Sequence, residues 1–111
     1  MDANLDWTPQ QCTLPTTERP LRVEEFDTLF AQAATGVERT GQGRARVRLR
    51  PGPDAASRAA GLAARETDCC SFFTFTLTVA SGELTLEVSV PAAHADVLDA
   101  LTARATGMLP D

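Results

Sequence analysis

Two stretches between residues 73 and 90 alternate strictly between apolar and polar residues, and this pattern constrains the fold more than any other feature. Phe73, Phe75, Leu77 and Val79 alternate with threonines, and Leu84, Leu86, Val88 and Val90 alternate with polar residues. The intervening Ala80-Ser81-Gly82-Glu83 is typical of a tight turn. Because side chains alternate between the two faces of a strand, both strands offer an apolar face to one core. The sequence therefore predicts a β-hairpin with one buried and one polar face.

Three helices and one more strand complete the predicted order. Apolar spacings of three and four predict helices over residues 23–37, 54–70 and 91–107. Strict alternation over residues 44–50 predicts a strand whose Ala45, Val47 and Leu49 face inward. Two glycines within residues 38–43 predict a loop before it. Residues 1–20 contain three prolines and no periodicity. They predict an extended arm, in which residues 11–14 can pair as a short edge strand.

The predicted order is arm-α-β-α-β-β-α, with an N-terminal arm over residues 1–20 and a single α/β domain over residues 21–111. Helices alternating with strands that are apolar on one face predict a two-layer α/β (α+β) sandwich with the helices on one face of the sheet. A right-handed connection through the second helix sets the strands on either side of it parallel. A small mixed sheet is therefore expected.

Composition excludes several classes of function. The 111 residues contain no run of 18 apolar residues, and the acidic N-terminus lacks the apolar region of a signal peptide. We therefore expect a cytoplasmic protein with no membrane partner. The net charge of −5 and the absence of lysine also argue against nucleic-acid binding, which needs a basic surface.

The junction between the second helix and the hairpin contains the adjacent cysteines Cys69 and Cys70. Together with Cys12 they are the three cysteines of the chain, and an odd number in an intracellular protein argues against a disulfide framework. Neighbouring helical side chains point about 100° apart, so two adjacent thiols reach one centre only where a helix ends. The pair is therefore either two small core residues or a pair of thiolate ligands.

The predicted surroundings favour a metal over a reactive thiol. Catalytic cysteines usually lie at a helix N-terminus or beside a cation, whereas Cys69 and Cys70 follow Glu66 and Asp68 at a predicted helix C-terminus. A bound cation reverses this disadvantage, because a metal deprotonates the thiols that coordinate it. Two or three thiolates suit soft ions such as Cu(I) and, by extension, Hg(II) and As(III). The usual zinc spacings are missing, and no organic cofactor is indicated.

Three further residues bear on this site. Cys12 completes a three-sulfur site if the arm folds across the helix end, and otherwise it is a chance residue of the arm. His94, the lone histidine, is either an exposed residue at a helix start or a further ligand. Glu66 lies one turn before the cysteines on the same helix face. It is either solvated at the margin of that face or a supporting acceptor or proton donor beside a metal thiolate.

The cysteine-containing segments resemble those of a group of small actinobacterial proteins. The likeness lies in Cys12-Thr13-Leu14-Pro15 and the residues that follow it, and in a Glu-x-x-Cys-Cys-x-Phe motif from Glu66 to Phe72. It covers most of the chain. The second motif also resembles short domains of metal-responsive regulators and metal-resistance loci. The resemblance implies a functional site at the cysteine pair, in metal resistance or sensing, and leaves its chemistry open.

These observations support three hypotheses. In the first, the protein binds a thiophilic metal or metalloid ion through Cys69, Cys70 and Cys12. In the second, it is a small thiol-dependent enzyme acting on an organometallic or other electrophile, with a cysteine as nucleophile and Glu66 or Asp68 as proton donor. In the third, it is a non-catalytic dimeric interaction module with core cysteines. Whether the chain is an enzyme is left open.

The arginine-rich strand offers a second surface. Its four arginines, which share the polar face of the sheet, are Arg44, Arg46, Arg48 and Arg50. One interpretation is a solvated face with cross-strand Arg–Glu pairs. The alternatives are a homodimer surface and an anion site.

Overall fold

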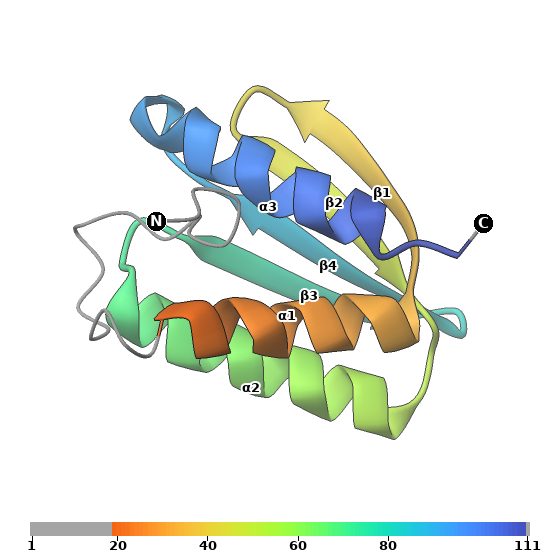
Figure 1. The fold of residues 1–111 in the computed structure, drawn as a ribbon. Coiled ribbons are helices and arrows are strands. Elements are labelled where there is room, and N and C mark those ends of the chain that lie inside the picture. The colour runs from red at the N-terminus through yellow and green to blue at the C-terminus, as the bar shows by residue number, and fades with distance from the viewer. Residues whose placement is uncertain (1–18, 111) are drawn as a thin grey trace.

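The computed structural model describes residues 19–110, which form three α-helices and a four-stranded sheet (Figure 1). The elements are α1 (Arg19–Ala33), β1 (Ala34–Gly41), β2 (Arg44–Leu49), α2 (Pro53–Cys69), β3 (Thr74–Ala80), β4 (Glu83–Ser89), a short 3₁₀ turn (Ala92–His94) and α3 (Ala95–Gly107). Cys12 and the predicted edge strand at residues 11–14 lie outside the described residues. No helix in residues 19–110 is long and apolar enough to cross a membrane.

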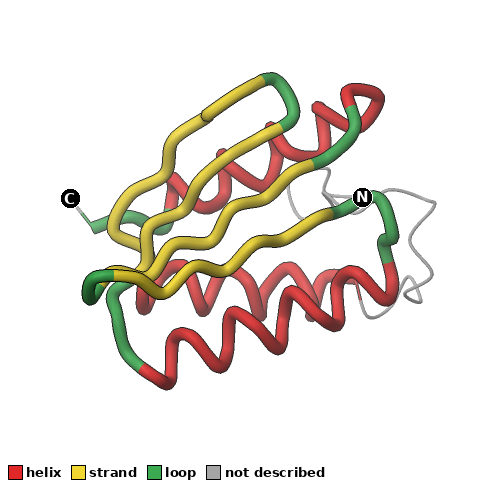
Figure 2. The backbone as a smooth tube through the Cα atoms, turned by 180° about the vertical axis from the view of Figure 1, so that it is seen from behind, coloured by secondary structure: helices red, strands yellow, loops and turns green. Residues whose placement is uncertain are grey.

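The sheet has the strand order β1-β2-β4-β3, and every neighbouring pair is antiparallel. Figure 2 shows the face of the sheet that no helix in residues 19–110 covers, with α3 behind the strands and α1 and α2 along the β3 side. The predicted two-layer α/β fold with helices on one face is confirmed. The expected mixed sheet is wrong, because β4 lies between β2 and β3. Those two strands run parallel to each other, as the connection through α2 requires, but they do not pair.

Strand β1 is the main difference from the predicted elements. The first helix was expected to reach residue 37 and a loop to fill residues 38–43, but α1 ends at Ala33 and β1 follows directly. Val37 pairs with Val47 of β2, and a half-buried strand suits such a β-branched residue better than a helix does. The two glycines belong to a hairpin around a two-residue turn rather than to a long loop. At its other end α1 begins at Arg19, so residues 19 and 20 are helical and not part of an extended arm.

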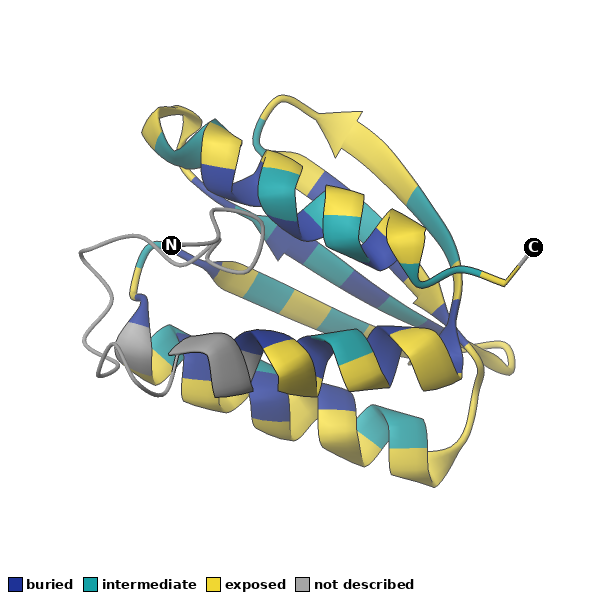
Figure 3. Ribbon diagram, viewed as in Figure 1, coloured by how far each residue is buried: buried dark blue, intermediate teal, exposed yellow. Residues whose placement is uncertain are grey.

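The core lies between the sheet and the three helices, as the burial colours in Figure 3 show. All predicted inward residues of the two central strands are buried, namely Ala45, Val47, Leu49, Leu84, Leu86, Val88 and Val90. The helices contribute buried apolar residues at spacings of three and four, including Val23, Phe26 and Phe30 from α1, Ala59 and Leu62 from α2, and Val97, Leu98, Leu101 and Ala105 from α3. This packing carries the C-terminal end of α2, where the cysteine pair lies, against the start of β3.

Candidate functional site

Glu66 and Cys70 lie at the end of α2 and inside the core. Both side chains are 0% exposed. The backbone N–H of Cys70 donates to the carbonyl oxygen of Glu66 at 2.7 Å and caps the helix. Among the described residues, Glu66 is the only buried polar or charged side chain. The structure therefore places Glu66 in the core and not at the solvated margin of the helix face.

The helix ends at the cysteine pair. Cys70 leaves helical geometry with φ −126° and ψ 88°, and its carbonyl oxygen accepts a hydrogen bond from the N–H of Phe73 at 3.2 Å. This bond closes a tight turn that leads into β3. Asp68, the other predicted carboxylate, is exposed. The side chain of Cys69 lies outside the described part of the structure, as does the whole of Cys12.

The electrostatics at this end of α2 favour a cation. The C-terminus of a helix carries the negative end of its dipole, and α2 has no basic residue in its last turn. Glu66 and Asp68 add two carboxyl groups within the same turn, one buried and one exposed. A positively charged ligand is therefore better matched to this end of α2 than an anionic substrate.

Aromatic rings line the region from the tight turn into the core. His94 stacks on Phe72, with ring centroids 4.2 Å apart and planes inclined by 14°. The ring centroids of Phe72 and Phe73 are 4.7 Å apart, and those of Phe73 and Phe75 are 5.3 Å apart. The ring of Phe75 lies 6.2 Å from that of Phe26, which in turn lies 5.9 Å from that of Phe30. We call this set of residues the aromatic row. It includes all five phenylalanines of the chain.

The aromatic row was not predicted from the sequence. His94 was expected to be exposed or to be a ligand, whereas it is half-buried and its ring faces that of Phe72. One local signal existed, because Phe72 is an apolar residue out of phase with the alternation that begins at Phe73. The contact between Phe26 and Phe75 joins residues that are far apart in the chain, and no short-range pattern reports it.

The described residues alone do not complete a metal site. Within residues 19–110, no group of three or more histidine, cysteine, aspartate or glutamate side chains is placed to hold a metal ion. Cys70 supplies one buried thiol, and Glu66 supplies one buried carboxyl group. Additional sulfur ligands would have to come from Cys69 and Cys12.

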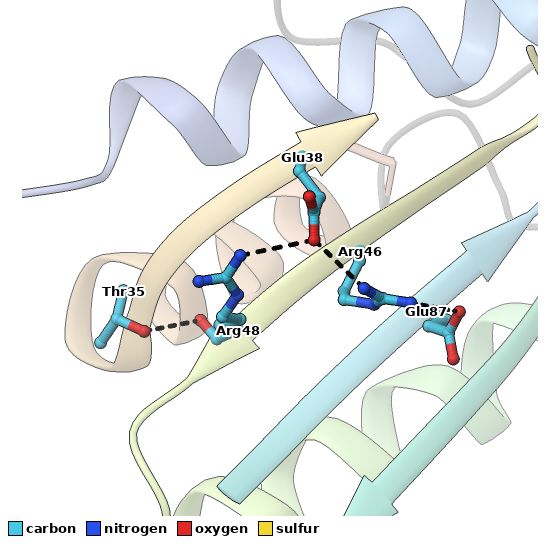
Figure 4. A network of polar contacts seen from close by, with 5 residues as sticks. All are labelled: Thr35, Glu38, Arg46, Arg48 and Glu87. Carbon is cyan, nitrogen blue, oxygen red and sulfur yellow. Dashed lines mark hydrogen bonds and ion pairs between the residues drawn. The ribbon is translucent and has the colours of Figure 1, made fainter. Parts of the chain in front are cut away.

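The sheet face opposite the described helices carries Arg46 and Arg48 of β2 in a network of ion pairs (Figure 4). Arg46 lies 3.2 Å from Glu38 and 3.7 Å from Glu87, and Arg48 lies 3.4 Å from Glu38. A hollow of about 640 Å³ on this face is lined by three arginines but also by Glu83 and Glu87. These pairs favour the solvated-face interpretation. An interface between two copies through Arg44, Arg46, Arg48 and Arg50 stays a prediction.

No protein-family model matches the chain, and no curated protein or solved structure is significantly similar to it. Function must therefore be inferred from the residues at the end of α2.

Proposed function

We propose that the protein binds a thiophilic metal or metalloid ion at the end of α2 through Cys69 and Cys70, with Cys12 as a third sulfur donor. The observation that carries this proposal is the complete burial of Glu66 and Cys70 one turn apart at the same helix end. A buried carboxyl group is costly unless it is hydrogen-bonded or paired with a positive charge. Departures from the rules of core packing concentrate at functional sites. A supporting role for Glu66 beside a bound ion accounts for its position.

The ion is of the Cu(I), Hg(II) or As(III) class. Thiolates are soft ligands and select soft ions, whereas Mg²⁺ and Ca²⁺ prefer oxygen ligands. The negative end of the α2 dipole favours positive charge here. A buried position also suits an ion that exchanges its hydration shell for two or three sulfurs. Structural zinc would require four ligands.

The same groups support a second candidate, a small thiol-dependent enzyme that cleaves an organometallic compound. The buried carboxyl group of Glu66, one helical turn from the buried thiol of Cys70, is the observation that favours it. A cysteine thiolate would bond to the metal, the carbon–metal bond would break, and Glu66 would protonate the departing carbon. The burial of Cys70 restricts this reaction to small substrates and favours the binding function over it.

Anaerobic titration of the reduced protein with Hg(II), Cu(I), As(III) and Zn(II) tests the binding function. Native mass spectrometry reports stoichiometry, and thiolate-to-metal absorption reports sulfur ligation. We expect one soft ion per chain, held against a competing monothiol, and loss of that complex in Cys69→Ser and Cys70→Ala. Glu66→Gln should weaken binding without changing its stoichiometry. Asp68→Asn is the matched control, because Asp68 is exposed on the same turn, and it should bind like the native chain.

Two other results would point elsewhere. If none of the four ions survives the monothiol and Cys70→Ala mainly lowers stability, the cysteines are core residues and the interaction-module hypothesis gains. If the reduced, metal-free protein turns over an organometallic substrate, the enzyme hypothesis replaces simple binding.

A further inference from the structure

Strand β3 forms an uncharged edge of the sheet. Among residues 19–110 it pairs with β4 alone. The stretch Thr74–Ala80 contains neither a charged residue nor proline. Its Val79 is 69% exposed and is the only exposed large hydrophobic side chain in the described part of the chain. Phe75 and Leu77 are only half-buried, whereas the inward residues of β4 are fully buried (Figure 3).

The opposite edge of the sheet is protected in the usual ways. Strand β1 has two register irregularities, before Gly36 and before Gly41. It carries Glu38 and Arg39, and Arg39 forms an ion pair with Asp99 of α3. Bulges and charges of this kind prevent a further strand from pairing. Strand β3 has neither device, so the two edges of the sheet differ in their capacity to accept another strand.

The hairpin turn decides which backbone groups of β3 point outward. The two-residue turn Ser81-Gly82 joins β3 to β4, and it makes Ala80 and Glu83 a hydrogen-bonded pair. Because such pairs alternate along an antiparallel ladder, the threonines of β3 bond to β4 through their backbone groups. The residues whose N–H and C=O groups point to the outer side are Phe75, Leu77 and Val79.

The outer flank of α2 is uncharged as well. Helix α1 lies between α3 and α2, so α2 is the outermost helix on the β3 side (Figure 1). Arg65 of α2 lies 2.9 Å from Glu25 of α1, and Arg58 contacts Gln32. Both arginines are therefore on the flank that faces α1. At about 100° per residue, the opposite flank consists of small residues, namely Ala56, Ala60, Ala63, Ala64 and Thr67.

We infer that the edge of β3 and this flank of α2 form one surface that binds a second copy of the chain. With Leu77 of both copies on a two-fold axis, Phe75 faces Val79 of the partner subunit. The outward backbone groups of the two strands then pair, and the two sheets become one. A two-fold interface requires a self-complementary surface, and pairs of an aromatic and a β-branched residue stabilise antiparallel strands.

The composition of α2 fits this arrangement. Paired strands lie about 4.8 Å apart, whereas the axes of packed helices lie about 8–10 Å apart. Pairing of the β3 edges therefore brings the two α2 helices close together, antiparallel on either side of the axis. Small residues on the facing flanks permit this approach, and the absence of charge on both the strand and the flank avoids repulsion between identical surfaces. This inference does not rest on the proposed function.

Sedimentation equilibrium of the full reduced chain tests the association. We expect a dimer that dissociates on dilution. Ala60→Glu sets two carboxylates against each other near the axis and should raise the Kd of the dimer by about tenfold or more. Ala60→Lys should do the same, and an equimolar mixture of the two variants should associate again. Ala103→Glu is the matched control, because Ala103 is an exposed alanine of α3, and it should dimerise like the native chain.

A second test addresses the backbone of β3. Val79→Pro removes an outward N–H from each copy, whereas Val79→Thr keeps it, so the proline variant should weaken the dimer more. Hydrogen exchange followed by NMR should show that the amides of Phe75 and Leu77 are protected in the dimer and lose this protection on dilution. The amides of Thr76 and Thr78, which donate to β4, should stay protected at every concentration.

Three outcomes would overturn the inference. A chain that sediments as a monomer even at millimolar concentration has no such interface. A dimer that is insensitive to both Ala60→Glu and Val79→Pro would use another surface, such as the arginines of β2. Protection of the outward β3 amides in a monomeric sample would mean that another segment of the same chain covers the edge. None of these measurements involves a metal, so they decide the interface whether or not the proposed function holds.

Discussion

The carbonyl oxygen of Glu66 accepts the backbone N–H of Cys70 at 2.7 Å, and both side chains are completely buried. This hydrogen bond ends α2 and fixes the backbone from which the carboxyl group and the thiol project. The two groups therefore occupy the same corner of the core, between α2 and the start of β3. Changes at either residue should affect packing as well as any bound ion.

Truncation of Glu66 should destabilise the fold. Glu66→Ala removes a buried side chain and leaves a cavity, which costs about 2–4 kcal/mol, while Glu66→Gln keeps the volume and costs less. Asp68→Ala is the control, because Asp68 is exposed. This substitution should change the free energy of unfolding by less than about 0.5 kcal/mol. Urea unfolding of the reduced protein measures all three. Equal effects of Glu66→Ala and Asp68→Ala would contradict the burial of Glu66.

Gly43 should not tolerate a side chain. A Cβ at this position would lie 2.4 Å from the carbonyl oxygen of Val90, and the N–H of Val90 also donates to the carbonyl oxygen of Gly43 at 2.8 Å. The backbone of Val90 would have to move to make room for the new Cβ. Gly43→Ala should therefore lower the free energy of unfolding by about 1–3 kcal/mol.

The matched glycine variant is Gly61→Ala, in the exposed middle of α2, where a Cβ meets no atom within 4 Å. It should raise the free energy of unfolding by about 0.5–1 kcal/mol, because alanine loses less conformational entropy in a helix than glycine does. In thermal melts the midpoint should fall for Gly43→Ala and rise for Gly61→Ala. A higher melting midpoint for Gly43→Ala would show that Gly43 and the backbone of Val90 are farther apart than described.

The ion pair between Arg104 and Asp27 should stabilise the fold more than the one between Arg39 and Asp99. Arg104 donates from Nε to Asp27 at 3.0 Å and also from Nη2, and the two side chains are only 19% and 15% exposed. Bidentate, partly buried pairs of this kind contribute about 1–3 kcal/mol. The Arg39–Asp99 side chains are 35% and 63% exposed, and their pair should contribute less than about 1 kcal/mol.

Double-mutant cycles with alanine at each position measure the two coupling energies. Added salt should reduce the Arg39–Asp99 coupling and leave most of the Arg104–Asp27 coupling. Coupling energies of equal size would mean that the α1–α3 contact is as solvated as the surface pair.

The parts of the fold that follow from local patterns were predicted well. The hairpin of β3 and β4, the inward face of β2 and the buried stripe of α2 all repeat with the period of their own element. Strand β1 was missed because the apolar spacing from Val23 continues to Val37 in helical phase, and only pairing with β2 reveals the strand. The antiparallel pairing of β4 between β2 and β3 likewise depends on tertiary contacts that no local pattern contains.

The candidate site divides in the same way. The four-residue spacing of Glu66 and Cys70 placed them on one helix face, but only the assembled core decides that Glu66 is inside it. The stacking of His94 on Phe72 and the Phe26–Phe75 contact join separate elements, so periodicity could not predict them. Cys12 is a separate case, because it lies outside the described residues and its predicted role as a third ligand stays a prediction.

The turn between β3 and β4 should depend on its two central residues. Ser81 has φ 54° and Gly82 has φ 75°, and hairpins of this type need positive φ at both positions. Gly82→Ala should lower the free energy of unfolding by about 1–2 kcal/mol, because a Cβ clashes in this region. Ser81→Val should lower it too, since a β-branched residue is disfavoured at positive φ, while Ser81→Asn should stabilise the turn. Urea unfolding ranks the three variants, and a neutral Gly82→Ala would mean that the strands are joined by a different turn.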